Sequence, residues 1–250
     1  MRILGAPAIL LDVVNLQERD RIVAFLTAEH GQKRGVANGA RTKFSRFAGQ
    51  LQPLAKAQVR WSEKDGRDLV RISEVQMIRP AAKLQEDLEG ILLGAYLAEQ
   101  FSEFAQEGEP TSDLFRLLDS TLDAMLAGVD PILAARYVEV WVLRLSGILP
   151  VPRECPLCGR ALEARAILLE VEGAVVCEDC AEGQQRFTVG PGELEFLRRS
   201  GRENLPRMAK APPPPAVLRR IEELCAKIRR HFLQGELRSY RVMRRTLAGS

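Results

Sequence analysis

The stretch KAQVRWSEKDGRDLVRISEVQMI, residues 56–78, contains two apolar runs separated by a tight turn. The runs Lys56–Trp61 and Leu69–Ile78 carry the β-branched and aromatic side chains that favour strands. Asp65-Gly66 lies between them, and this pair readily adopts the positive φ angles of a hairpin turn. The stretch therefore predicts a β-hairpin, and Pro80 marks the end of the strand region.

Three further strands are expected on the N-terminal side of this hairpin. Ile9, Leu11 and Val13 alternate along a first strand, Arg21–Thr27 is a second apolar run, and Val36-Ala37 is a short third one. Glycines separate the runs. Five short strands are too few for a sandwich of two full sheets, but they suit a small closed barrel. We therefore predict a five-stranded OB-fold over residues 1–80.

The hydrophobic period changes after Pro80 and becomes helical. Residues 84–104 follow helical spacing, and Gly108-Glu109-Pro110 breaks the pattern. Thr111-Ser112-Asp113 has the composition of an N-terminal cap for a second helix. Asp130-Pro131 opens a third helix with proline at its first position.

The remainder of the chain also reads as mainly helical. A short helix is expected near Glu193–Arg199, and Pro212–Pro215 reads as a stiff polyproline spacer. A final helix is expected over Val217–Leu233. The fold class predicted for the chain is α+β, with the barrel followed by an all-α domain.

Four cysteines between the third and fourth helices form a C-x2-C…x18…C-x2-C pattern. They are Cys155, Cys158, Cys177 and Cys180. Two residues between cysteines let one tight turn present two thiolates on the same side, which suits a tetrahedral zinc ion. Glu172-Gly173 fits a hairpin that returns the second pair to the first. We predict one structural zinc ion, because four sulfur ligands leave no open position for water or substrate.

Other interpretations of these cysteines remain open. Disulfides and an iron–sulfur cluster both use four cysteines, and a redox C-x-x-C motif needs only one pair. The N-terminus lacks the apolar stretch of a secretory signal, and no apolar run reaches the ~18 residues that span a bilayer. We therefore expect a cytoplasmic location, where thiols stay reduced, and no membrane association. A fifth cysteine, Cys225, lies on the apolar stripe of the final helix and reads as a core thiol.

Charge is distributed unevenly along the 250 residues. Residues 1–80 hold 14 Lys/Arg against 8 Asp/Glu, residues 81–183 hold 7 against 19, and residues 184–250 hold 15 against 6. Two basic ends suggest contact with a polyanion. The alternative is that exposed helix faces are basic with no functional meaning.

The most basic stretch, residues 33–47, holds five cations, two phenylalanines and no acid. An exposed loop of this composition would attract phosphates, and Phe44 or Phe47 could stack on a base. The alternative for Phe44, Phe47 and Trp61 is a place in the barrel core, which we favour for Trp61. The expected DNA-binding residues are Lys33, Arg34, Arg41, Lys43, Phe44 and Arg46.

No catalytic constellation stands out. The two histidines, His30 and His231, lack a nucleophile or acidic partner at recognisable spacing, and no phosphate-binding glycine loop occurs. We predict a binding protein rather than an enzyme. A protein-interaction adaptor that uses the acidic middle, and a zinc-dependent nuclease, remain as alternatives.

Many segments, in order, resemble the bacterial recombination mediator family RecO. The segments are Ala8–Leu11, Glu18–Val23, Leu26–Gly31, Val36–Arg41, Leu51–Pro53, Asp87-Leu88, Ala95–Leu97, Leu114-Phe115, Arg136-Tyr137, Leu145–Pro150 and Leu237–Ser239 with Arg241. Thr42-Lys43-Phe44 departs from the family, in which many members have a further basic residue.

The resemblance implies an N-terminal OB-fold and a helical domain with an inserted zinc finger. It implies binding of single- and double-stranded DNA, annealing of complementary strands, and partnership with RecR. It also implies contact with the single-strand-binding protein, so that RecA loads onto coated DNA. The expected divisions are an OB-fold DNA-binding region (1–80), a first helical part (81–150), a four-cysteine zinc finger (151–185) and a second helical part (186–250).

Overall fold

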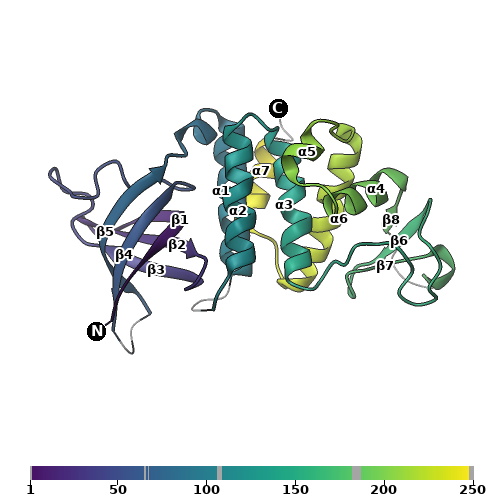
Figure 1. Cartoon of the computed structure of the whole chain (residues 1–250), viewed down its shortest axis with the longest axis horizontal. Coiled ribbons are helices and arrows are strands. Elements are labelled where there is room, and N and C mark those ends of the chain that lie inside the picture. Colours follow the sequence, from purple (N-terminus) through teal and green to yellow (C-terminus); the bar gives the residue numbers. More distant parts are fainter. Residues whose placement is uncertain (1, 65, 67, 106–108, 182–186, 248–250) are drawn as a thin grey trace. The chain divides into compact units, whose positions relative to one another are not determined.

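The computed structural model describes residues 2–64, 66, 68–105, 109–181 and 187–247 (Figure 1). The chain divides into two compact units, of which the first is Met1–Leu126 with Val242–Ser250 and the second is Ala127–Arg241. Two expected breaks, Asp65 of the hairpin turn and Gly108 after the first helix, lie outside the described residues.

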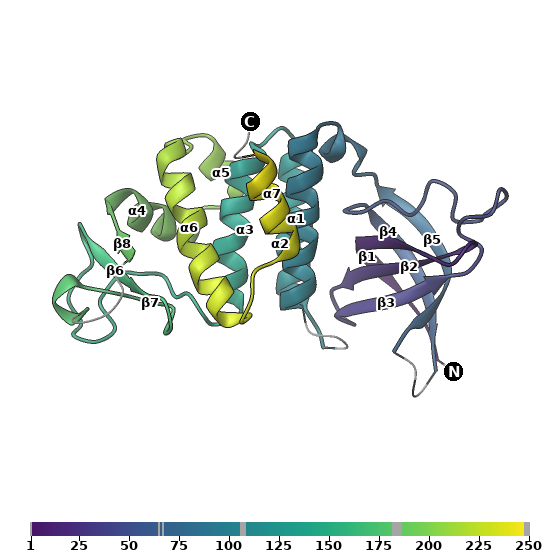
Figure 2. The same ribbon diagram turned by 180° about the vertical axis from the view of Figure 1, so that it is seen from behind.

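The first unit contains a closed five-stranded barrel in the order β1-β2-β3-β5-β4 (Figures 1 and 2). The strands are β1 (Arg2–Leu16), β2 (Asp20–Thr27), β3 (Gln32–Ala37), β4 (Lys56–Glu63) and β5 (Val70–Arg79). Only the β3–β5 pair is parallel among these described strands. The predicted fold class, an N-terminal five-stranded barrel before a helical region, is confirmed.

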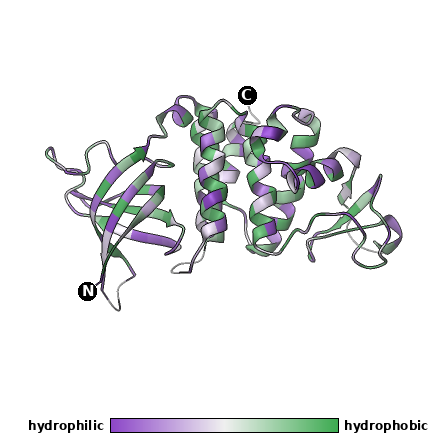
Figure 3. Cartoon of the chain, in the orientation of Figure 1, coloured by the Kyte–Doolittle hydropathy of each residue, from purple (hydrophilic) through white to green (hydrophobic). Residues whose placement is uncertain are grey.

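The barrel closes around an apolar core. Leu10, Phe25, Trp61 and Ile72 are fully buried, and the Phe25 and Trp61 rings meet edge to face with their centroids 5.3 Å apart. Apolar and polar residues alternate along β4, where Ala57, Val59 and Trp61 are buried, whereas β2 carries a continuous apolar run (Figure 3). Gly35 permits the β3–β5 closure, because a Cβ atom there would lie 2.7 Å from Val70 Cγ2.

Two helices complete the first unit, α1 (Leu88–Phe104) and α2 (Ser112–Leu126), after a 3-10 turn η1 (Ala82–Gln85). Polar contacts hold α2 to the barrel. Thr111 Oγ1 donates to the Thr27 carbonyl at 2.9 Å, and Asp119 forms ion pairs with Lys56 and Arg79 at 2.6 and 2.7 Å.

The second unit is built on α3 (Pro131–Leu145) and α6 (Pro215–Phe232), which lie side by side (Figures 1 and 2). The Asp130 side chain caps α3 by accepting from Leu133 N at 2.7 Å, as the Asp130-Pro131 pair predicts. Arg136 of α3 is 1% exposed and forms ion pairs with Glu139 and Glu222.

The other elements of the second unit follow in chain order. They are β6 (Ala166–Leu169), β7 (Ala174–Val176), η2 (Glu178–Cys180), β8 (Phe187–Val189), α4 (Pro191–Ser200), α5 (Leu205–Ala209) and α7 (Arg238–Leu247), of which α7 crosses the division between the units. Helix α4 packs on both α3 and α6, and α5 packs on α3. The β6–β7 hairpin turns at Gly173, which has φ +63°. The expected hairpin between the cysteine pairs is therefore present.

The structure corrects the sequence prediction in three places. Helix α6 begins at Pro215, so this residue belongs to the helix and not to the proline spacer. The final helix is not α6 but α7, which has only ten residues, four of them arginine, and which buries Tyr240 and Met243 at helical spacing. Strand β8 has only three residues and becomes a strand through pairing with β6.

Candidate metal centre and nucleic-acid interface

The four cysteines converge into one cluster. One ligand atom from each of Cys155, Cys158, Cys177 and Cys180 lies within 4.8 Å of the others, and Cys158 Sγ is 3.6 Å from Cys177 Sγ. A tetrahedron of sulfurs around zinc has edges of about 3.8 Å, because each Zn–S bond is about 2.3 Å long. All four are free thiols. The donor set and its spacing fit one tetrahedral metal ion.

Tight backbone turns place each pair of thiols. The Cys155 N–H donates to the Arg160 carbonyl at 2.7 Å, and the Gly159 N–H donates to the Cys155 carbonyl at 2.9 Å. Gly159 has φ +74°, a conformation that costs glycine little. In the second pair, Cys177 precedes the single turn of η2 and Cys180 ends it, and the Cys180 N–H donates to the Cys177 carbonyl.

The thiols differ in acidity. Burial alone would raise the pKa of Cys155, but backbone N–H groups of Cys177, Leu157 and Cys158 lower it to about 6. Hydrogen bonds with Cys177 and Cys158 raise the pKa of Cys180 to about 12. Cys155 therefore loses its proton readily, whereas the neighbouring thiols disfavour ionisation of Cys180. A divalent cation compensates such charge, and metal binding displaces the remaining protons.

The cysteine region is anchored to the helices of its own unit. Arg198 of α4 donates to the Pro152 carbonyl at 3.2 Å and also to the Leu162 carbonyl. Arg220 of α6 lies 4.0 Å over the Phe187 ring, and Lys227 forms a 2.7 Å ion pair with Glu170. These contacts attach the cysteine region to α4 and α6, as expected for a structural metal site. Cys225 is separate, because it is fully buried in α6 and burial raises its pKa.

Four of the six expected DNA-binding residues, Arg41, Lys43, Phe44 and Arg46, lie in the loop between β3 and β4, residues 38–55. Lys43, Phe44 and Arg46 are exposed, and the Phe44 side chain is 91% accessible. The Lys43 ammonium lies 5.6 Å from the centre of the Phe44 ring. The Arg46 guanidinium lies instead over the neighbouring Phe47 ring, 5.0 Å from its centre. An exposed aromatic ring with a cation beside it, in a basic loop, has the chemistry of a single-strand stacking platform.

The loop contacts the barrel on both sides of these residues. On the N-terminal side, the Arg41 N–H donates to the Arg19 carbonyl at 2.9 Å. On the C-terminal side, Phe47 is 2% exposed within the barrel core, and the Met77 N–H donates to Gln50 Oε1 at 2.7 Å. Stacking of a base on Phe47, considered from the sequence, is therefore wrong, because its ring is buried. Trp61 is also in the core, as we favoured.

The two expected residues on β3 and Arg41 of the loop have different surroundings. Lys33 is half-buried and forms a 3.1 Å ion pair with Glu63, which compensates its charge. Arg34 is exposed on β3. Arg41 is exposed, but its Nη1 atom donates to the Gln17 carbonyl at 2.6 Å. The DNA contacts of these residues stay predictions.

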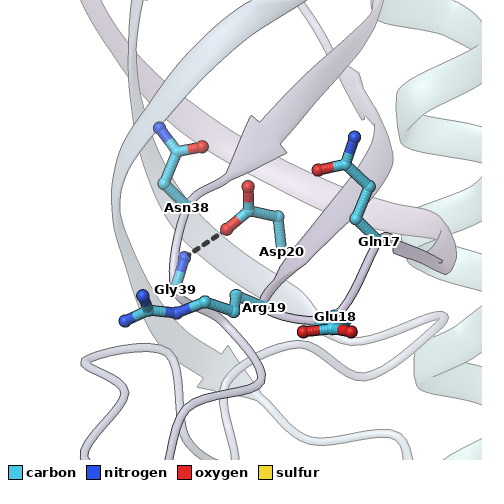
Figure 4. A pocket seen from close by; sticks show the side chains of 6 residues that line it. All are labelled: Gln17, Glu18, Arg19, Asp20, Asn38 and Gly39. Atoms are coloured by element: carbon cyan, nitrogen blue, oxygen red, sulfur yellow. Dashed lines mark hydrogen bonds between the residues drawn. The ribbon is translucent and has the colours of Figure 1, made fainter.

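A cavity of about 660 Å³ lies beside this loop and was not foreseen from the sequence. It is lined by Gln17, Glu18, Arg19, Asp20, Asn38 and Gly39 (Figure 4). The lining comes from the turn between β1 and β2, from the first residue of β2, and from the start of the β3–β4 loop. No local sequence pattern marks it, since the two segments meet only through the barrel topology.

Within the described residues, no helix has the length and apolarity required to cross a membrane. Two family models match the chain, "Recombination protein O N terminal" over residues 1–81 and "Recombination protein O C terminal" over residues 85–241.

Similar proteins span nearly the whole chain. A protein of Anaeromyxobacter sp. (strain K), named DNA repair protein RecO, is 32% identical over 94% of this chain and 93% of its own length. Proteins of the same name are 33% identical in Myxococcus xanthus (strain DK1622), over 94% and 95%, and 27% identical in Desulforamulus reducens, over 98% and 95%.

Proposed function

The chain belongs to the RecO family of DNA-repair proteins, and from that premise we propose that it is a non-enzymatic recombination mediator. In this role it binds single- and double-stranded DNA non-specifically and anneals complementary strands. With RecR, it helps RecA to load onto DNA coated by the single-strand-binding protein. We place this activity in the cytoplasm.

The observation that carries the proposal is the loop that presents Lys43, Phe44 and Arg46 to solvent from a closed barrel. Cations neutralise backbone phosphates and release counterions, which drives association with any sequence. An exposed ring adds stacking energy for single strands because every base has a π-face. Arg34 and Arg41 are exposed as well and add positive charge for phosphates, while the charge of Lys33 is compensated by Glu63.

We further propose that the metal held by the four cysteines is one zinc ion with a structural role. All four ligands are sulfur, which suits zinc and leaves no coordination position for catalysis. The zinc-finger boundaries (151–185) and the other three divisions (1–80, 81–150 and 186–250) are part of this proposal. Partnership with RecR and with the single-strand-binding protein follows from family membership.

DNA binding is tested with the double variant Lys43→Ala/Arg46→Ala. We expect weaker binding of single-stranded oligonucleotides of every sequence, measured by fluorescence anisotropy at low salt. The matched control is Lys83→Ala/Arg116→Ala, which removes two exposed cations from η1 and α2. Equal affinities of the two variants would show that the loop is not the binding surface.

Mediator activity is tested by annealing complementary oligonucleotides that are coated with single-strand-binding protein. We expect the intact protein to accelerate annealing without any nucleotide, and Lys43→Ala/Arg46→Ala to reduce the rate. A requirement for nucleotide hydrolysis, or cleavage of the strands with added Mg²⁺, would overturn the non-enzymatic assignment.

A further inference from the structure

The cavity beside the basic β3–β4 loop (residues 38–55) is an open surface pocket, and hydrogen bonds join its two sides. The Arg41 N–H donates to the Arg19 carbonyl at 2.9 Å, and its Nη1 atom donates to the Gln17 carbonyl at 2.6 Å. The Gly39 N–H donates to Asp20 Oδ1 at 2.7 Å (Figure 4). Three hydrogen bonds therefore tie the β1–β2 turn to the start of the β3–β4 loop. A site held in this way needs little ordering when a ligand binds.

The polar groups of the cavity favour a neutral ligand that donates hydrogen bonds. Glu18 and Asp20 place two carboxylates on either side of Arg19 in the sequence, so the charged lining is net negative. Such a lining repels phosphate. Asp20 uses Oδ1 for the Gly39 N–H, and Oδ2 provides a further acceptor. Figure 4 shows Asn38, Asp20 and Gln17 pointing to the same side.

The size and position of the cavity narrow the choice of ligand. Its volume of about 660 Å³ is within the range of about 300–1,000 Å³ that is usual for small-molecule sites. Gly39 at its wall precedes Lys43, Phe44 and Arg46 on the same loop, and the Thr42 N–H and Oγ1 both donate to the Gly39 carbonyl. DNA phosphates bound by the loop would bring nucleobases next to the cavity.

We propose that this cavity accepts one unpaired nucleobase of bound single-stranded DNA and prefers bases that carry an exocyclic amino group. The Asp20 carboxylate accepts from the amino group, and Asn38 and Glu18 supply further polar contacts at the base edge. Arg41 is a positioning residue, because it holds the two walls together. This inference rests on the proposed DNA binding and adds a base-reading subsite to it.

Cytosine and thymine distinguish the proposal, because they have similar size but differ at position 4. Cytosine has an amino group there and thymine has a carbonyl oxygen. We expect the protein to bind (dC)20 about five times more tightly than (dT)20 at pH 8 and equal salt, which is modest because the site is open to solvent. Anisotropy titrations with labelled oligonucleotides measure this ratio.

The decisive variant is Asp20→Asn. Its side-chain oxygen can still accept from the Gly39 N–H, while its amide nitrogen replaces a carboxylate acceptor by a donor. The affinity for (dC)20 relative to (dT)20 should therefore fall to one or reverse in favour of (dT)20. Asp12→Asn is the matched control, since Asp12 is exposed on the same barrel, also accepts a backbone N–H, and does not line the cavity. Asp20→Asn and Asp12→Asn each remove one negative charge from the barrel.

The outcomes separate this inference from the proposed function. A wild-type ratio of one, or an unchanged ratio in Asp20→Asn, overturns the base pocket while DNA binding stands. Absence of binding to both oligonucleotides overturns the proposed function itself. If Asp20→Asn does not fold, as judged by its thermal transition, Glu18→Gln is used, and a ratio equal to wild type then counts against the pocket.

Discussion

The barrel and the cysteine region both contain small β-sheets, but different forces hold them together. The barrel strands have 6–15 residues and enclose a continuous apolar core that includes Trp61. Strands β6, β7 and β8 have four, three and three residues. Such short strands bury little surface by themselves, and small structures of this kind are usually held by a metal or disulfides. The barrel should therefore fold through burial, and the cysteine region through its ligand.

The largest effect is expected when a metal ligand is removed. Cys155→Ser should abolish stoichiometric zinc and unfold the cysteine region, because structural zinc contributes on the order of 10 kcal/mol to small zinc domains. Elemental analysis and limited proteolysis between residues 151 and 190 measure both effects. Cys225→Ser is the control, since Cys225 is a buried thiol outside the cluster. A Cys155→Ser protein that keeps zinc and protease resistance would contradict the claim that the metal holds the cysteine region together.

The next effect concerns the barrel alone. Trp61→Ala should lower the free energy of unfolding by about 3–5 kcal/mol, because it leaves a cavity in the core. Zinc content should not change. Urea denaturation followed by circular dichroism measures the loss. Full retention of stability would mean that the core is not what holds the barrel.

Phe44→Ala should show the opposite behaviour to Trp61→Ala. Its stability should change by less than about 0.5 kcal/mol, since the ring is exposed. Single-strand affinity should fall by about 1–3 kcal/mol through the loss of base stacking. Phe44→Trp is expected to retain affinity. A stability loss without an affinity loss would place this ring in a structural role.

The smallest effect is the pH dependence of one ion pair. Burial would raise the pKa of Glu63, but hydrogen bonds from Trp61 and Lys33 and the charge of Lys33 hold it below 4.5. The stabilisation is therefore present above pH 4.5 and is lost as the pH falls through the folded-state pKa. Glu63→Gln should cost about 1 kcal/mol or less at pH 7.

Urea midpoints of wild type and Glu63→Gln at pH 7 and pH 3 measure this dependence. The difference between the two proteins should shrink at the lower pH. A difference that grows on acidification would contradict the sign of the pKa shift.

Local patterns explain what could be predicted from the sequence. The cysteine spacing, the apolar strand runs and the Asp130-Pro131 helix start all act over a few residues, and each led to the correct element. Phe44 and Phe47 show the limit of such reasoning. They lie three residues apart in one basic loop, yet one is 91% exposed and the other 2%. Only the packing of the loop against the barrel decides between them.

Long-range contacts account for the other parts of the site that the sequence did not reveal. The bond from Arg41 to the Gln17 carbonyl spans 24 residues, and the Lys33–Glu63 pair joins strands that are distant in the chain. The cavity walls also come from two separate turns. Composition shows that the loop is basic, but it does not show which cations already have partners.

The salt dependence of single-strand binding tests the central claim most directly. Affinity for an oligonucleotide should fall linearly on a log–log plot of binding constant against salt, with a slope of about −0.7 for each phosphate neutralised. Lys43→Ala/Arg46→Ala should make that slope shallower, by about 0.7 for each cation that contacts a phosphate. A flat wild-type plot, or an unchanged slope in the variant, would contradict binding through the basic loop.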